Sequence, residues 1–390
     1  MQFVDGIPIW GAPDPGAVSQ IKTCALTADR VALMADHHKG YAVPIGGVVA
    51  YKDAISPSGV GFDIGCGNKA VRVDMPGSEL RAGIRHIMDD VWNTISFGVG
   101  RKNNERVDHQ LFDSGGWKAK PASSLKEIAR QQLGTVGSGN HYVDLFTDEE
   151  DRVWIGVHFG SRGLGHKIAT WFLEKANVKG GMDVEPCVIP ASTDLGEQYI
   201  VCMNLAGEYA YAGRDWVCRR VAKILGAEIV EEVHNNHNFA WRETHGGEEY
   251  WVVRKGATPA FPGQKGFVGG TMGETSVILE GVENEAAKHS LYSTVHGAGR
   301  VMGRMEAKGK VDRKTGAVLR PGKVSQEMMR EWVDRAGIEL RGAGLDESPH
   351  CYKRLNEVLA EHGSSIRILH TLRPVGVAMA GANEFDPYKD

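Results

Sequence analysis

The segment from Val295 to Arg304 combines the residue types of a phosphate-transfer site. His296 is followed by three small residues and then by Arg300 and Arg304, four and eight positions later. Small neighbours let a bulky phosphate approach an imidazole, guanidinium groups match phosphate oxygens in bidentate geometry, and a neutral imidazole nitrogen can attack phosphorus. The segment therefore indicates a histidine–phosphate intermediate, although a tight glycine turn beside a surface histidine would also account for it.

Five other short segments place an ionisable residue beside glycine or at the end of an expected strand. In one of them Asp63 and Cys66 lie three residues apart in a glycine-rich turn, so both side chains could face one ion. A thiolate, imidazoles and a carboxylate together suit manganese, iron, cobalt or zinc, and a thiolate could bridge two metals. A lone buried cysteine is usually a small hydrophobic residue. The prediction of a metal site therefore depends on all five segments, which cover residues 35–40, 61–67, 137–141, 157–163 and 234–238.

These segments must be positioned by strands and helices that follow one another in no regular order. Because the two types do not alternate cleanly, a doubly wound sheet is not expected. We expect an α+β fold, a single large domain over residues 1–390 with mixed and antiparallel sheets and flanking helices. Alternating or apolar runs predict strands at 47–51, 70–74, 153–158, 250–254 and 276–280, and a closing hairpin of 366–372 and 374–380. Periodic apolar positions and capping residues predict helices at 77–94, over 192–233, from Ser325 to about 341 and from Pro349 to Gly363.

The composition is that of an ordinary globular protein with one excess. The chain has 390 residues, of which 42% are hydrophobic and 24% charged, and its net charge of −4 gives no general attraction to nucleic acid or membrane. A nucleic-acid partner would need a local basic groove. We expect segments 101–120 and 308–323 to contribute to it, the latter as an exposed basic loop or hairpin. The 50 glycines, nearly twice the usual frequency of roughly 7%, indicate many tight loops.

The sequence also bears on the cellular compartment. The six cysteines form no CxxC pair, and the N-terminus has no charged and apolar signal segment. No apolar run approaches the roughly 18 residues that cross a membrane. We therefore expect a cytoplasmic protein with reduced thiols and no membrane partner.

In combination and in order, motifs along the chain resemble those of the RtcB-type RNA-splicing ligases. The resemblance runs from about Met34 to Gly381 and is highly specific as a set. The motifs that carry it are Asp36-His37-His38 with Pro44-Ile45-Gly46-Gly47, the glycine-rich turn 59–67, Leu133 to His141, His158 to His166, His237 to Ala240, Arg254 to Ala257, Met272-Gly273 and His296 to Arg300.

The resemblance implies an RtcB-like fold and a ligase that uses GTP and divalent metal, commonly two manganese ions, with other divalent metals as alternatives. The histidine that matches His296 attacks the α-phosphorus of GTP, becomes guanylylated and releases pyrophosphate. A 2′,3′-cyclic phosphate RNA end is opened to a 3′-phosphate, which accepts GMP. The 5′-hydroxyl of a second RNA end then attacks, and GMP leaves. This chemistry serves tRNA splicing or RNA repair, and some relatives need an archease-type activator.

The resemblance also assigns roles to residues of this chain. Asp36 matches a carboxylate that serves catalysis together with His296. The implied metal ligands are Asp63, Cys66, His141, His158 and His237. The implied contacts to the nucleotide cofactor are Asn140, Asp144, Arg162, Thr271, Met272, Gly273, Arg300 and Arg304.

One ligand assignment has two candidates. His234 and His237 both qualify as the third imidazole, and we choose His237 because the run from His237 to Ala240, followed by Glu243, fits the family phrase better. His234 is then a residue behind the ligands or a plain surface histidine.

The expected base pocket departs from the family pattern. Asp144 stands where the family has glutamate, and Met379 stands where it has a lysine. Gly303 replaces a serine, and Gly269 and Thr271 replace a proline and a serine of the loop before Met272. Because the departures cluster at the nucleotide base and its loop, a changed nucleotide preference or a specialised repair paralogue is an alternative.

Two other functions fit the same residues. The protein could be a metallophosphoesterase that opens cyclic-phosphate RNA ends without a nucleotide, or a non-catalytic, metal-containing RNA-binding paralogue. The sequence shows no recognisable RNA-binding module, so the RNA substrate follows from the resemblance and not from charge.

Overall fold

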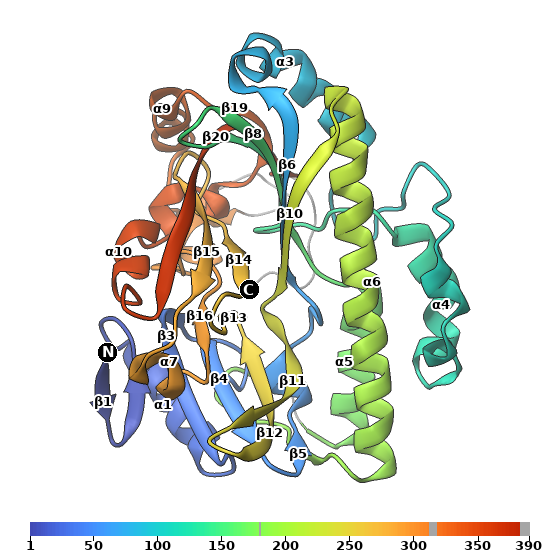
Figure 1. Cartoon of the computed structure of the whole chain (residues 1–390), viewed down its shortest axis with the longest axis vertical. Helices are drawn as coiled ribbons and strands as arrows, with labels where there is room; N and C mark the ends of the chain where they lie inside the picture. The colour runs from blue at the N-terminus through green and yellow to red at the C-terminus, as the bar shows by residue number, and fades with distance from the viewer. Residues whose placement is uncertain (179–180, 312–317, 383–390) are drawn as a thin grey trace.

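Two large β-sheets form the frame of the protein (Figure 1), whose computed structural model describes residues 1–178, 181–311 and 318–382. In this described part, neighbouring strands are antiparallel except for the pairs β2–β3 and β19–β20, which confirms the expected α+β class. The six-stranded sheet has the order β1 (Gln2–Val4), β2 (Ile7–Ile9), β3 (Arg30–His38), β4 (Ile45–Tyr51), β12 (Glu248–Lys255), β11 (Asn238–His245). The eight-stranded sheet has the order β10 (Ile229–Asn236), β6 (Gly67–Pro76), β8 (Arg152–Phe159), β7 (Tyr142–Thr147), β20 (Ile366–Gly381), β15 (Ser276–Gly281), β14 (Lys265–Val268), with β19 (Glu339–Ala343) beside β20.

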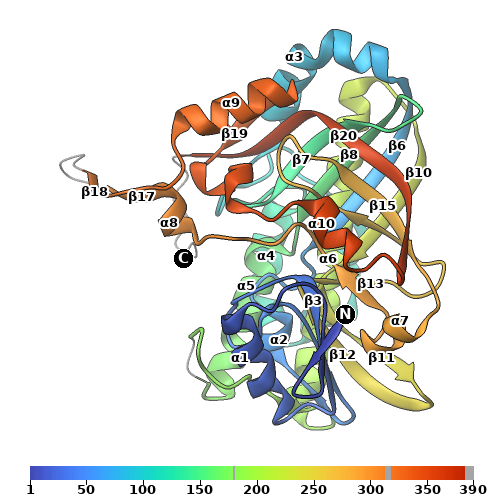
Figure 2. The same ribbon diagram turned by 90° about the vertical axis from the view of Figure 1, so that its left-hand side faces the viewer.

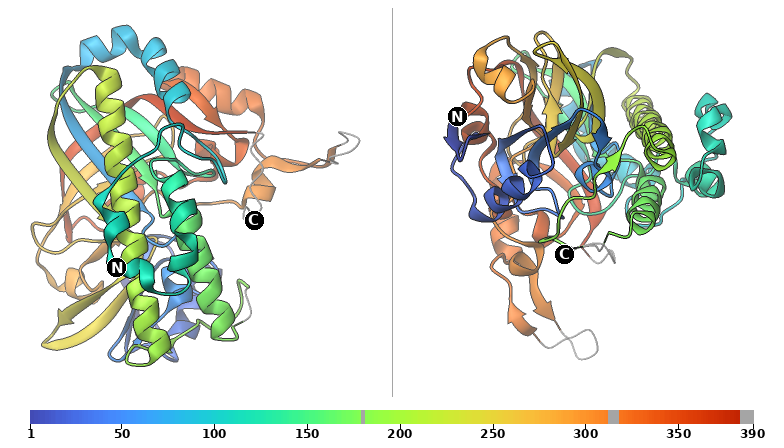
Figure 3. Two further views of the ribbon diagram at one scale, coloured as in Figure 1. Left: turned by 90° about the vertical axis from the view of Figure 1, so that its right-hand side faces the viewer. Right: turned by 90° about the horizontal axis from the view of Figure 1, so that it is seen from below.

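Helices cover both sheets. The long helix α6 (Asp194–Leu225) packs along β6 and β8, with α5 (Arg162–Lys175) and α4 (Ala122–Gln132) beside it (Figure 3). Buried side chains such as Val71, Val157 and Val217 join α6 and the helix α3 (Gly77–Thr94) to the eight-stranded sheet. Burial of one such side chain contributes about 1.5–3 kcal/mol. The other elements are α1 (Pro15–Ala25), α2 (Pro57–Val60), α7 (Glu285–His289), α8 (Arg304–Lys308), α9 (Gln326–Ala336), α10 (Leu355–Ala360) and the short strand pairs β5 (Ala54–Ile55) with β9 (Ile189–Pro190) and β13 (Ala257–Pro259) with β16 (Ser293–Val295).

The helical prediction over 192–233 is wrong at its C-terminal end. Helix α6 stops at Leu225, because Gly226 takes a left-handed conformation with φ 68° that caps it. The residues that follow form β10, in which exposed and partly buried positions first alternate as in a strand. This correction matters because the strand, unlike a helix, leads the chain directly into the candidate site.

The closing segment is one strand and not a hairpin. Strand β20 continues through Pro374, where its pairing with β7 shifts register between Pro374 and Gly376. A bulge accommodates the proline because no ladder hydrogen bond is needed from its nitrogen. The helix begun by Ser325 is also shorter than expected: α9 ends at Ala336 because Gly337, with φ 66°, caps it. The expected helix from Pro349 to Gly363 is a 3₁₀ turn at Pro349–Cys351 followed by α10.

A thin hairpin extends from the body of the molecule. It pairs β17 (Gly309–Val311) with β18 (Val318–Pro321) within the basic segment 308–323, and Figure 2 shows it projecting beyond α8. The intervening residues 312–317 lie outside the described part of the chain. Among the described residues, no helix combines the length and the apolar character needed to cross a membrane.

Candidate metal centre and nucleophile

The register of the eight-stranded sheet gathers donor side chains at one end of its central strands. His158 pairs with Asn68 on β6 and with Tyr142 on β7, so His141 lies one residue before Tyr142 and Cys66 lies two residues before Asn68. On the other side of β6, Asn236 pairs with Gly67. The chain then passes through His237 from the eight-stranded sheet to β11 of the six-stranded sheet. Four segments far apart in sequence therefore meet where the two sheets join.

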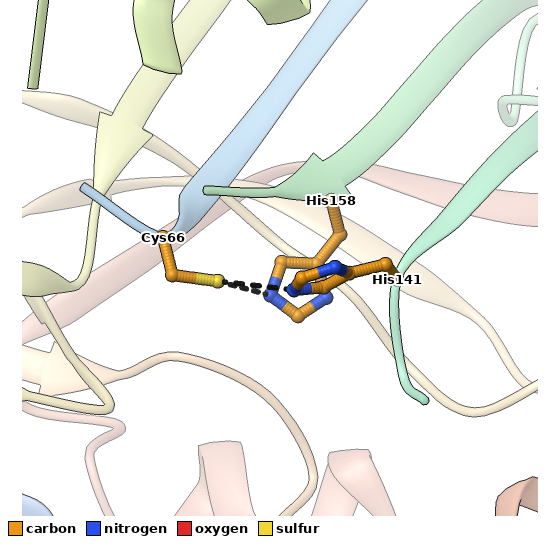
Figure 4. Close-up of side chains that lie close together, drawn as sticks. All are labelled: Cys66, His141 and His158. Atoms are coloured by element: carbon orange, nitrogen blue, oxygen red, sulfur yellow. Dashed lines mark hydrogen bonds between the residues drawn. The ribbon is translucent and has the colours of Figure 1, made fainter. Parts of the chain in front are cut away.

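The donor atoms of Cys66, His141 and His158 point toward one another (Figure 4). Cys66 Sγ lies 3.3 Å from His158 Nε2 and 3.7 Å from His141 Nε2. His158 Nε2 lies 3.3 Å from His237 Nε2, and His141 Nε2 lies 3.1 Å from Asp63 Oδ2. Two ligands that each lie about 2.0–2.3 Å from one ion are themselves about 3–4 Å apart. Cys66, His141 and His158 thus form a candidate metal cluster, with Asp63 and His237 against it.

The protonation of this cluster suits a cation. His158 Nδ1 lies 3.0 Å from the Asn140 carbonyl, which can only accept, so the proton sits on Nδ1 and the lone pair of Nε2 faces the cluster. Burial lowers the pKa values of His158 and His237 well below the ordinary value, so both rings are neutral. Burial opposes ionisation of Asp63, but His141 and Arg162 outweigh it and lower its pKa to about 2. Asp63 Oδ2 is buried and, although His141 Nε2 lies 3.1 Å from it, it makes no hydrogen bond of regular geometry with the described residues. These donors fit a divalent cation with mixed sulfur, nitrogen and oxygen preferences.

His234, the other candidate ligand, lies away from the cluster. Its ring packs on Tyr211 with centroids 3.8 Å apart, and its Nε2 accepts a hydrogen bond of 2.7 Å from Arg214. Arg214 is fully buried and also donates to the carbonyl oxygens of Gly65 and Phe159, next to two of the donor residues. Arg214 therefore holds together the backbone that carries the cluster. Sequence reasoning missed this arginine, because the same helix also carries Arg219, Arg220 and Lys223, and nothing in the sequence distinguishes Arg214 from them.

Asp36 and His296 form a tight pair beside the cluster. Asp36 Oδ2 accepts hydrogen bonds from His296 Nδ1 at 2.6 Å, from the His296 backbone N–H at 2.9 Å and from the Gly297 N–H at 3.3 Å. Burial opposes ionisation of Asp36, but His296 outweighs it, and the pKa of Asp36 lies below its ordinary value. An ionised carboxylate only accepts, so Nδ1 carries the proton, and in the neutral ring the lone pair is on Nε2. The ring of His237 stands edge-on to that of His296 with centroids 4.9 Å apart, which links the pair to the cluster.

The surroundings of Asp36 fix its position. Strand β3 shifts register against β4 between Leu33 and His38, which turns Asp36 out of the regular ladder. Lys353 Nζ donates to the carbonyl oxygens of Ala35 and His37, at 3.0 and 3.1 Å, on either side of Asp36. Gly299, with φ 76°, lies so close that a side chain there would collide with the Asp36 carbonyl.

A cleft of about 1340 Å³ opens over the cluster and His296. Arg162, the first residue of α5, reaches it with a left-handed backbone (φ 56°), a strained conformation typical of functional sites. Gly273, also expected to contact the nucleotide, does not line the cleft. Its turn packs against Trp332 and Ala336. The other residues expected to contact the nucleotide line the cleft together with Arg162: Asn140, Asp144, Thr271, Met272, Arg300 and Arg304.

Two buried carboxylates anchor the arginines of the His296 segment. Arg304 forms ion pairs with Asp346, at 2.9 Å, and with Glu347. Arg300 donates to the hydroxyl of Tyr352 at 2.8 Å, and that hydroxyl donates to Glu347. Asp346 and Glu347 were not identified from the sequence, because adjacent acidic residues in a loop are common. They hold both guanidinium groups at the cleft wall.

Replacing Glu347 with alanine tests this anchoring. We expect the free energy of unfolding to fall by about 3–5 kcal/mol, because the change removes one of the two carboxylates that neutralise the buried guanidinium of Arg304. Chemical denaturation measures the change. Glu361→Ala, at an exposed position after α10, is the control and should shift stability by less than about 0.5 kcal/mol. Equal stability of the two variants would contradict the anchoring role.

Asp144 and Met379 lie on neighbouring strands of the eight-stranded sheet, in the wall of the cleft. Asp144 pairs with Val377, and Met379 pairs with Tyr142, on the neighbouring strands β7 and β20. Both side chains line the cleft, and Asp144 Oδ1 is buried with no partner among the described residues. Burial raises the pKa of Asp144 well above its ordinary value. The carboxyl is therefore neutral over a range of pH in which an exposed aspartate is charged.

This raised pKa predicts a pH-dependent stability difference. Because the folded-state pKa exceeds the unfolded one of about 3.9, the group's contribution is full below that pH and is lost as the pH rises to the folded-state pKa. Asp144→Asn removes the titration. We expect the variant to gain stability relative to the parent by up to about 1.4 kcal/mol per pH unit from about pH 5 until the pH reaches the folded-state pKa, above which the difference is constant. Urea denaturation of both proteins at several pH values measures it, and a pH-independent difference would count against a neutral Asp144.

The fold and the cleft define a class of α+β protein in which a candidate metal cluster adjoins an aspartate-paired histidine. The family model for tRNA-splicing ligase RtcB matches residues 17–116 and 108–380. The chain belongs to the RtcB family. It is 30% identical over 387 residues to the RNA-splicing ligase RtcB of Escherichia coli K12, covering 88% of each chain. It is 32% identical over 433 residues to the tRNA-splicing ligase RtcB of Thermococcus kodakarensis, covering 89% of this chain and 86% of the relative.

Proposed function

We propose that this protein is a metal- and GTP-dependent RNA ligase. It joins RNA ends that carry a 2′,3′-cyclic phosphate or a 3′-phosphate to 5′-hydroxyl ends, in tRNA splicing or RNA repair. The observation that carries the proposal is the position of His296, whose Nδ1 is bound to Asp36 and whose ring adjoins the metal cluster through His237. Family membership and the ligase names of the relatives support the same activity.

The His296–Asp36 pair supplies the nucleophile. Asp36 holds the proton on Nδ1, so the lone pair of Nε2 is free to attack the α-phosphorus of GTP. A nitrogen–phosphorus bond forms, the bond to the β-phosphate oxygen breaks, and pyrophosphate leaves. Asp36 stabilises the positive charge that develops on the ring. A 3′-phosphate oxygen of the RNA then displaces the imidazole and takes up the GMP group. Finally, the 5′-hydroxyl of the second RNA attacks that 3′-phosphorus, loses its proton and expels GMP.

The cluster residues are the proposed ligands of two manganese ions, or of other divalent metals. Bound ions would polarise the phosphates and lower the pKa of an attacking hydroxyl. The five residues are Asp63, Cys66, His141, His158 and His237. Asn140 and Arg162 are proposed to contact the phosphates from the cluster side, and Arg300 and Arg304 from the His296 side, because phosphoryl transfer chiefly requires positioning and charge neutralisation.

The base end of the cleft sets the nucleotide preference. An ionised carboxylate accepts from the two N–H groups of the guanine edge, whereas a neutral carboxyl offers one donor and one acceptor. The raised pKa of Asp144 and the absence of a cation at Met379 therefore favour weaker guanine selectivity than a charged carboxylate would give. Thr271 and Met272 form the adjoining wall.

A labelling and joining assay tests the proposal. The protein is incubated with Mn²⁺ and each of the four α-labelled nucleoside triphosphates, and then with RNA ends of both kinds, with and without an archease-type activator. We expect acid-labile label on the protein, strongest with GTP, and joined RNA that depends on nucleotide. End processing without nucleotide would instead indicate a metallophosphoesterase. RNA binding without labelling or turnover would indicate a non-catalytic paralogue.

A further inference from the structure

Three aromatic rings form a ladder in the wall of the cleft. The rings of Phe62 and His166 are stacked, with centroids 5.2 Å apart and planes at 24°. The ring of Tyr41 meets Phe62 edge-on, with centroids 6.3 Å apart. All three residues line the cleft and are partly exposed, so the ladder is not part of the closed core. Nothing in the proposed chemistry at His296 uses these rings.

The ladder is fixed to the elements that carry the candidate metal centre. Phe62 immediately precedes Asp63 in the glycine-rich turn. His166 lies four residues after Arg162 on α5, which places both on the same face of that helix. The carbonyl of Tyr41 accepts a 2.6 Å hydrogen bond from the buried Lys255. The rings therefore keep a constant position relative to the cluster.

Lysines accompany the ladder. Lys39 lies two residues before Tyr41, Lys167 follows His166, and both line the cleft, as does the exposed Lys102. Lys39 is paired with Asp183 at 2.6 Å. Asp14 also lines the cleft. Of these three lysines, Lys102 and Lys167 form no ion pair with a carboxylate of the described residues. Aromatic faces beside cationic side chains are the combination that binds single-stranded nucleic acid, because bases stack on the rings while lysines face the phosphates.

The ladder and the Asp144 side chain are carried by different parts of the fold. Asp144 and Met379 belong to the eight-stranded sheet. Tyr41 follows β3 of the six-stranded sheet, and Phe62 and His166 lie in a turn after α2 and on α5. The carboxyl of Asp144 and the three rings therefore reach the cleft from different elements of the fold.

We propose that Tyr41, Phe62 and His166 form a stacking subsite for the base of a terminal nucleotide of single-stranded RNA, with the phosphates held by the adjoining lysines. The inference rests on the proposed function, because it names where that ligase holds an RNA end. Stacking is sequence-tolerant, since every base has a π-face. The subsite therefore binds RNA ends of any sequence and discriminates against an end that lacks a base.

Equilibrium binding of ten-nucleotide RNAs tests the subsite without requiring turnover. Each RNA carries a fluorophore and ends in a 3′-phosphate or a 5′-hydroxyl, and each is compared with the same RNA made abasic at that terminus, in the presence of Mn²⁺. For the parent protein we expect at least one terminus at which loss of the base weakens binding roughly tenfold. For Phe62→Leu we expect this ratio to fall toward one, and for Phe62→Tyr we expect it to be kept.

Phe261→Leu is the matched control. Phe261 is also partly exposed and stacked, on Tyr292 with centroids 4.9 Å apart, but it lies outside the cleft lining. The ratio of the two affinities within one variant is insensitive to a general loss of folded protein. Equal binding of complete and abasic RNA by the parent protein would overturn the subsite. A Phe62→Leu variant that keeps the parent's ratio of affinities for complete and abasic RNA, but loses affinity for GTP, would also overturn it. A base-dependent ratio together with failed labelling and joining would overturn only the proposed function.

Discussion

Alanine at position 296 is expected to abolish covalent labelling of the protein by α-labelled GTP. The imidazole is the proposed bond-forming group, and among the described residues it is the histidine whose Nδ1 is held by a buried carboxylate at 2.6 Å. Without it no nitrogen–phosphorus bond can form at this position. Labelling, followed by acid treatment and gel analysis, measures the loss. His86→Ala, at an exposed position on α3, should label like the parent protein.

Asp36→Asn refines this result. The amide keeps the size of the side chain but removes the charge that orients Nδ1–H and stabilises the charged ring. We expect labelling to slow by about 10²–10⁴-fold while the protein stays folded and keeps its bound metal. Retained labelling in His296→Ala would refute the nucleophile assignment. Unchanged labelling in Asp36→Asn would confine Asp36 to a structural role.

Cys66→Ala is expected to weaken metal binding by at least about 100-fold. Cys66 Sγ lies within 3.7 Å of two imidazole nitrogens, so its removal opens the centre of the cluster. Metal per chain after dialysis, measured by elemental analysis, gives the direct readout. Cobalt substitution gives a second one, because a sulfur–cobalt charge-transfer absorption requires the thiolate.

The control for this prediction is Cys218→Ala. Cys218 is also a free, buried cysteine, but it packs between α6 and the sheet. The Cys218→Ala protein should keep its metal and its cobalt absorption even if the truncated side chain lowers its stability. Binding of metal to the folded state also raises Tm, so Mn²⁺ should raise the Tm of Cys218→Ala and not that of Cys66→Ala. Equal metal content in the two variants would show that Cys66 is not a ligand.

The local elements of the fold followed from the sequence where the signal was local. Helix α3 spans the predicted residues 77–94, and β4, β6, β8, β12 and β15 each contain the predicted run. Ser325 does cap α9, because a serine side chain bonds a backbone N–H three residues on in any context. The errors arose at Gly226, Gly337 and Pro374, where one residue is compatible with more than one backbone path. Left-handed glycine caps ended the two helices, and pairing with β7 kept β20 continuous through Pro374.

The sequence by itself determined the chemistry of the candidate site, because glycine-rich turns that carry Asp63, Cys66, His141, His158 and His296 specify donor types and close backbone approach locally. Only the tertiary structure decided which groups meet. The register of β10 and β6 sends His237 into the cluster and leaves His234 against Arg214. The tertiary structure also places Asp36, which lies 260 residues from His296 in sequence, where it accepts the hydrogen bond from His296 Nδ1. A contact between such distant segments depends on the packing of two sheets, and no spacing along the chain encodes it.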